Sequence, residues 1–326
     1  MEAALGKTAA AYDPEKITVI VSDPITGEIL GMANRSRHAP NGNPADMAKA
    51  EHDPVAAFQI VTLAAAIEEG KFDPSEIYES GTYKEIPGAP IRDHNNGIGW
   101  GKITFEEGIR RSSNVAFAKL AYEHLQQHLL QEYWDRFGFG QKTGIELQSE
   151  ESGALPKMTG PREVALASIG YGGSASAIQQ IAAVGAIANG GELLKPHLMK
   201  KAQADSANDY KIRRVVSEET AKQVREILES VVNSDVGSGR AFHIDKYPVA
   251  GKSAVNQKYD EQGKVMEGHY IASFLGFAPS DDPKLLIYVA VDDPKTELHV
   301  GIEWKKIVAP PFKEVMEKSL QYLEKR

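Results

Sequence analysis

Strand-like segments occupy the two ends of this 326-residue chain, and helix-like segments fill the middle. Residues 17–22 are β-branched and alternating, residues 23–27 are typical of a turn, and residues 28–32 suit a second strand, so a hairpin is predicted. Further strands are predicted at 249–258, 270–278 and 285–292. Their short connections favour antiparallel neighbours. Because both ends then contribute to one sheet, we expect an α+β fold with helices inserted between them.

The helical middle has clear start and stop signals. Residues 55–69 are rich in alanine, place apolar side chains on one face and end before Gly70, with Asp53 as the expected N-cap. Thr104 and Glu107 form a capping-box pattern, which predicts one helix that continues to about residue 124. Further helices are predicted at 127–136, 176–189, 217–232 and 311–323. These segments predict a helical lobe beside the sheet.

Composition excludes several kinds of site. The chain has no cysteine, which excludes a disulfide, a thiolate metal site and a cysteine nucleophile. Its formal net charge is −8, from 37 basic and 45 acidic residues, and this balance argues against a nucleic-acid-binding role. The N-terminus has no signal-peptide core, and no stretch approaches the ~18 apolar residues of a membrane span. We expect no metal, no cofactor and no nucleic-acid partner.

Three segments stand out together, at 52–62, 111–117 and 249–258. Their order, spacing and expected elements resemble the transpeptidase domain of class B penicillin-binding proteins, from about Ile17 to Leu323. The resemblance implies the fold shared by penicillin-binding proteins and serine β-lactamases, with an antiparallel sheet, flanking helices and an inserted helical lobe. The expected division is a leader remnant at 1–15 and a domain at 16–326, with its sheet lobe at 16–33 and 240–326 and its helical lobe at 34–239.

The family's first motif, Ser-x-x-Lys, is altered in this sequence. The position of the nucleophile is Ala56, which has no hydroxyl, and the position of the general base is Gln59, whose amide cannot take a proton at neutral pH. The second motif, Ser-x-Asn, is intact as Ser112 and Asn114. In the family these two residues supply a proton relay and a donor to the substrate amide. The resemblance therefore implies a groove whose acylating centre is missing.

The third motif, Lys-Thr-Gly-Thr in the family, is only partly preserved, as Lys252-Ser253-Ala254-Val255. Ser253 keeps the hydroxyl, Ala254 adds a methyl group where the substrate backbone approaches, and Val255 removes a hydroxyl that would hold the substrate carboxylate. Tyr171, within a glycine-rich loop, is expected to line the same groove. By this resemblance, both substrate binding and chemistry are impaired.

These changes predict a catalytically inactive transpeptidase-like domain with a binding or scaffolding role in bacterial peptidoglycan synthesis, at division or sporulation. Its expected partners are a weakly held peptidoglycan stem peptide and proteins of cell-wall synthesis or division, and β-lactams are expected to bind non-covalently or not at all. The expected location is the extracytoplasmic face of the bacterial membrane, as a piece without its N-terminal anchor. Three alternatives remain: an active D,D-transpeptidase or carboxypeptidase with Ser112 or Ser253 as a displaced nucleophile served by Lys252, an engineered inactive variant of an active enzyme, and a muropeptide sensor.

Overall fold

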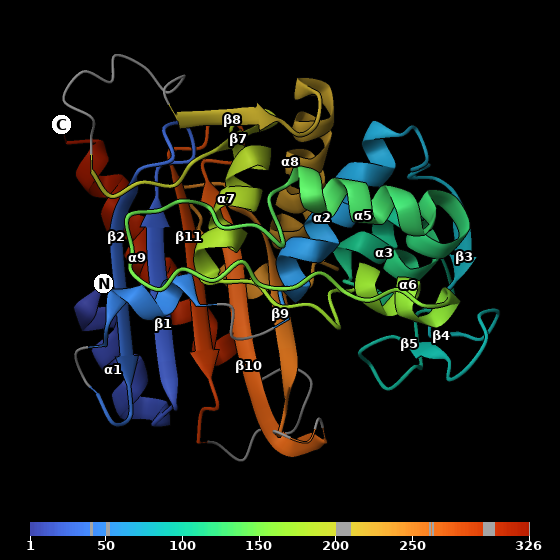
Figure 1. Cartoon of the computed structure of the whole chain (residues 1–326), viewed down its shortest axis with the longest axis horizontal. Helices are drawn as coiled ribbons and strands as arrows, with labels where there is room; N and C mark the ends of the chain where they lie inside the picture. Colours follow the sequence, from blue (N-terminus) through green and yellow to red (C-terminus); the bar gives the residue numbers. More distant parts are fainter. Residues whose placement is uncertain are drawn as a thin grey trace.

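A five-stranded antiparallel sheet forms one side of the molecule (Figure 1). The computed structural model describes residues 1–39, 42–49, 53–199, 210–260, 262, 264–295 and 304–325. The strand order is β2-β1-β11-β10-β9, with bounds β1 Lys16–Ser22, β2 Ile29–Ser36, β9 Ala250–Tyr259, β10 Val265–Ala278 and β11 Leu285–Asp292. The predicted sheet, built from both ends of the chain, is confirmed. Its edge strand β9 faces the helical lobe, because α2 and α8 pack against it.

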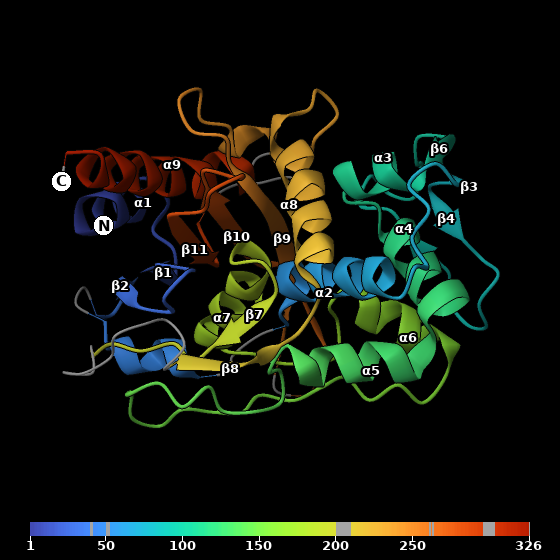
Figure 2. The same ribbon diagram turned by 90° about the horizontal axis from the view of Figure 1, so that it is seen from above.

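Helices cover both faces of this sheet (Figure 2). On one face lie α1 (Glu2–Tyr12) and α9 (Trp304–Leu323), and on the other lies α7 (Ala177–Ala188). The residues before 16, expected to be a leader remnant, form α1, and Ala4 and Leu5 of this helix are buried in the apolar cluster beneath α9. An apolar contact of this kind gives the segment a place in the fold that a local pattern cannot predict.

The helical lobe holds the remaining elements. Its α-helices are α2 (Val55–Glu68), α3 (Phe105–Arg110), α4 (Asn114–Lys119), α5 (Gln126–Arg136), α6 (Pro161–Ser168) and α8 (Glu218–Asn233). Shorter elements are η1 (Pro44–Ala48), the π-helical turn η2 (Leu120–Leu125), η4 (Arg240–Phe242), β3 (Ile77–Glu79), β4 (Thr82–Tyr83), β5 (Ile91–Arg92), β6 (Lys102–Thr104), β7 (Glu192–Leu194) and β8 (Lys211–Arg214). No helix in the described ranges is long and apolar enough to cross a membrane.

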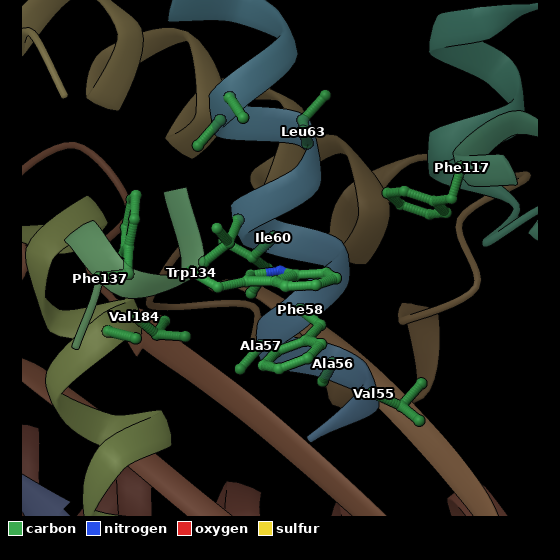
Figure 3. Packing of buried hydrophobic residues seen from close by; sticks show 14 of the residues in the cluster. Val55, Ala56, Ala57, Phe58, Ile60, Leu63, Phe117, Trp134, Phe137 and Val184 are labelled. Atoms are coloured by element: carbon green, nitrogen blue, oxygen red, sulfur yellow. The ribbon is translucent and has the colours of Figure 1, made fainter. Parts of the chain in front are cut away.

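Two apolar clusters fill the described part of the molecule, and the larger one lies among α2, α5, α7, α8 and the sheet. Helix α2 is its central element. Twelve of its 14 residues, from Val55 to Ala66, are buried. Phe58 stacks on Trp134 of α5 with ring centroids 4.6 Å apart (Figure 3). The small alanine side chains let α5, α7 and α8 approach α2, which also packs against β9.

The predicted helix from Thr104 to about residue 124 is wrong in one respect, because it breaks after Arg110. Thr104 caps α3 as expected, with its hydroxyl accepting a hydrogen bond from Glu107 N at 3.2 Å. Ser113 then starts α4, and its hydroxyl accepts from Ala116 N at 3.1 Å. Between them Ser112 has φ of 60°, a left-handed conformation that ends the first helix. A second cap therefore overrides the continuous helical pattern.

Candidate functional site

The first turn of α2 presents no reactive group. Ala56 is 1% exposed, and its methyl group belongs to the larger apolar cluster. Gln59, one turn further on, is 2% exposed; its Nε2 donates to Ile169 O at 3.5 Å, and its Oε1 is buried without a hydrogen-bond partner. Asp53 does not cap the helix as predicted, because Pro54 occupies the N-cap position without a side-chain hydrogen bond. The two altered residues of the first motif thus pack as core side chains.

Lys252 and Ser112 form the polar pair of the site. Lys252 Nζ donates to Ser112 Oγ at 2.5 Å and lies 5.8 Å from the ring centroid of Phe117. The lysine side chain is 1% exposed. Burial, together with the nearby charge of Lys305, lowers the pKa of Lys252 to about 7. A large fraction of this amine is therefore neutral at neutral pH, and the neutral form can accept a proton.

The break between α3 and α4 depends on Asp93, which the sequence analysis did not single out. Its Oδ1 accepts from the Ser113 hydroxyl at 2.8 Å and from Val115 N at 3.0 Å, and its Oδ2 accepts from Gly81 N at 2.8 Å. The side chain is 2% exposed. In the sequence Asp93 stands in a run of turn-forming residues, so no local signal distinguishes it from a solvated turn aspartate.

Asn114 uses its side-chain amide to hold a backbone carbonyl. Its Nδ2 donates to Arg92 O at 2.9 Å, which ties α4 to β5. Of the two residues that match the second motif, the structure thus brings Ser112 directly to Lys252 and commits the amide nitrogen of Asn114 to a backbone carbonyl.

The third motif lies on β9, where side chains alternate between two faces. Lys252, Ala254 and Asn256 face the helical lobe, and Ala254 joins the same apolar cluster as α2. Val255 packs instead with the cluster beneath α9, so its side chain lies on the opposite face from Lys252. Ser253 is 6% exposed, and its carbonyl lies 3.4 Å from Lys252 Nζ.

Asp53 ties three segments together at the entrance to this region. Its backbone carbonyl accepts from Asn256 Nδ2 of β9, and its carboxylate accepts from Gly172 N at 3.2 Å. Burial raises the pKa of Asp53 to about 6, against the opposing effect of the backbone N–H groups. Tyr171, in the same loop, is half-buried against the larger apolar cluster. The start of α2, strand β9 and the loop at 170–174 are thus joined around one residue.

In the described ranges, no three His, Asp or Glu side chains gather closely enough to hold a metal ion. A helix start, a hydroxyl on a helix break and a lysine on an edge strand thus converge from distant parts of the chain.

Comparison with known proteins identifies the family. The family described as "Penicillin binding protein transpeptidase domain" matches residues 17–317, and the chain belongs to it. It is 38% identical to Stage V sporulation protein D of Bacillus subtilis over 99% of this chain and 52% of that protein. It is 29% identical to the probable peptidoglycan D,D-transpeptidase PenA of Neisseria meningitidis over 98% of this chain and 54% of that protein. The chain thus spans about half the length of these relatives.

Superposition on a solved structure supports the same fold. The transpeptidase domain of penicillin-binding protein 3 from Burkholderia pseudomallei superposes with a TM-score of 0.85 at 28% identity, covering 98% of this chain and 92% of that one. The fold expected from the three motifs is therefore confirmed: a penicillin-binding transpeptidase fold with an antiparallel sheet and an inserted helical lobe.

Proposed function

We propose that this domain is catalytically inactive as a transpeptidase and acts in peptidoglycan synthesis by non-covalent binding or scaffolding. The observation that carries the proposal is Ala56 at the first turn of α2, where it is buried and has no hydroxyl. Gln59, one turn on, has no basic group to activate a nucleophile. Losing one member of a nucleophile–base unit costs ~10⁴- to 10⁶-fold in rate, and losing the second adds little.

The biological setting follows from the relatives. Similarity to a stage V sporulation protein supports a role in sporulation, and similarity to probable peptidoglycan D,D-transpeptidases supports a peptidoglycan stem peptide as the ligand. Division is the alternative setting. We place the domain on the extracytoplasmic face of the membrane, where peptidoglycan is assembled, with proteins of cell-wall synthesis as partners.

One contact favours a second candidate function, an acyl transferase with a displaced nucleophile. Ser112 Oγ lies 2.5 Å from Lys252 Nζ, whose lowered pKa permits a neutral amine. With a β-lactam as substrate, Ser112 Oγ attacks the lactam carbonyl carbon and gives its proton to Lys252. The lactam C–N bond then breaks, and the nitrogen takes that proton from the lysine. The position of Ser112 argues against this second function, because Ser112 lies on a helix break and not at the start of α2.

Labelling with a fluorescent penicillin, followed by a denaturing gel and intact-mass measurement, separates the two candidates. The inactive domain stays unlabelled while still unfolding cooperatively. An adduct that persists in wild type and disappears in Ser112→Ala contradicts the inactive assignment and identifies the displaced nucleophile. Ser149→Ala is the matched control, because Ser149 shares the left-handed φ of Ser112, 59° against 60°.

A further inference from the structure

The loop at 170–174 lies directly against the start of α2. Gly170 and Gly172 have φ of 100° and 86°, a left-handed conformation that glycine adopts without strain. A Cβ added at Gly170 would lie 2.3 Å from Val55 Cα, so the two backbones are in contact. This contact places the loop beside Asp53, which stands two residues before the first residue of α2.

The carboxylate of Asp53 holds the tip of this loop, Gly172 and Gly173. Its Oδ1 accepts from Gly172 N at 3.2 Å, and the N–H group of Gly173 also stabilises the carboxylate. In the described part of the chain, Gly172 N has no other acceptor. The backbone carbonyl of Asp53 accepts from Asn256 Nδ2, which fixes the residue to β9. One side chain is therefore the polar link between the loop tip and the start of α2.

A hollow of about 530 Å³ opens beside this link, and Asp53, Gly173 and Asn256 line one end of it. A polar hollow of this size admits water. Asp53 is partly buried while the loop tip covers it, whereas water in the hollow would hydrate its carboxylate once the tip moved away. Because burial disfavours an ionised carboxylate, the covered arrangement favours the protonated side chain and an open arrangement favours the ionised one.

We propose that Asp53 is a pH-dependent switch for the loop tip: protonation favours the closed arrangement, and ionisation shifts the tip toward an open arrangement that widens the hollow. Burial raises the pKa of Asp53 to about 6 from the ordinary aspartate value of 3.8, and the two N–H groups oppose this effect without cancelling it. Between these values the closed form binds the extra proton, so the open form gains as pH rises. The full change in the opening equilibrium is about 100-fold, since each pH unit of pKa difference contributes a factor of about ten.

Other ionisable groups surround Asp53, although the first turn of α2 carries no acidic residue. Those that line the hollow or belong to the loop, to β9 or to the preceding segment are Glu15, Lys16, Glu51, His52, Tyr171, Lys252, Lys258 and Asp292. Glu51 and His52 lie outside the described residues. Histidine side chains ordinarily change charge between about pH 5 and 8, and the pKa of Lys252 is about 7. The titration of His52 and Lys252 must therefore be separated from that of Asp53.

Amide hydrogen exchange, followed by nuclear magnetic resonance on the whole domain, tests the switch. The exchange rate of Gly172 N–H, divided by its intrinsic rate at each pH, gives the opening equilibrium. We expect this equilibrium to increase about tenfold between about pH 5 and 8 in wild type. Gly191 N–H is the control amide, because it donates to Ala186 O at 2.7 Å in the cap of α7 and should keep a constant opening equilibrium.

Three variants identify the titrating group. Asp53→Asn keeps an oxygen acceptor and removes the charge, so the opening of Gly172 N–H should no longer depend on pH. His52→Gln and Lys252→Met should each keep the wild-type dependence. A second measurement needs no variant: the carboxyl carbon resonance of Asp53 should titrate with a midpoint of about 6.

Four results would overturn the switch. They are a midpoint close to 3.8 for Asp53, an opening equilibrium that is constant with pH in wild type, a pH dependence that persists in Asp53→Asn, and one that disappears in His52→Gln or Lys252→Met. The inference does not rest on the proposed inactivity, which penicillin labelling measures separately.

Discussion

Lys252 Nζ lies 2.5 Å from Ser112 Oγ, although 140 positions separate the two residues in the chain. The pair joins edge strand β9 to the break between α3 and α4. The chain keeps this hydrogen bond although Ala56 stands at the position of the family's nucleophile. The contact can therefore stabilise the fold without any acyl transfer.

Ser112→Ala is expected to lower the free energy of unfolding by about 1–3 kcal/mol, because Lys252 loses a hydrogen-bond partner in a buried position. Urea unfolding followed by circular dichroism measures the change. Ser149→Ala has the same left-handed φ at an exposed position and should change stability by less than about 0.5 kcal/mol. Equal effects of the two substitutions would show that Lys252 finds another acceptor.

The stability of the protein should depend on pH through Lys252. Its pKa is lowered to about 7 in the fold from the ordinary lysine value of 10.5, so between these values the unfolded chain binds the extra proton. Stability therefore rises with pH across this window, with a slope that approaches about 1.4 kcal/mol per pH unit.

The measurement compares wild type with Lys252→Met in urea unfolding from neutral pH to the upper end of that window. The stability difference, wild type minus variant, should increase with pH. Lys71→Met, at an exposed position, serves as the control and should follow wild type. A difference that does not change with pH would mean that the buried amine keeps its proton.

Restoring only the first motif should restore little activity. In Ala56→Ser with Gln59→Lys, the methyl group of Ala254, which faces the helical lobe on the same side of β9 as Lys252, still fills space where a substrate backbone would approach. Adding Ala254→Gly should raise the rate of acylation by a fluorescent penicillin by about tenfold or more over the double variant, since an extra methyl group in a tight site costs roughly 1–3 kcal/mol. A double variant as fast as the triple variant would show that Ala254 matters little.

Asp93→Asn is expected to cost about 2–4 kcal/mol, because one oxygen of a buried carboxylate with three donors becomes an NH₂ group. Thermal and urea unfolding measure the loss. Asp73→Asn is a matched control, since Asp73 also accepts from a serine hydroxyl and a backbone N–H, at 2.7 and 2.9 Å, but near the surface. Its expected cost is about 1 kcal/mol or less. Similar losses for both variants would argue that burial of Asp93 adds nothing.

Local patterns in the sequence determined the elements and the chemical identity of the altered positions. The hairpin of β1 and β2, strand β11 at residues 285–292 and the caps at Ser176 and Ser217 are where their patterns predict, because period and capping depend on neighbours within a turn or two. Ala56 and Gln59 likewise exclude the family's usual nucleophile and base on chemical grounds alone.

Only the tertiary structure decided how the remaining groups meet. The break at Ser112 and the support from Asp93 depend on contacts between residues far apart in the chain. The pKa of Lys252 is lowered by burial and by Lys305, which α9 carries to it. Burial and long-range electrostatics depend on the whole fold, so a pattern of nearby residues could not contain them.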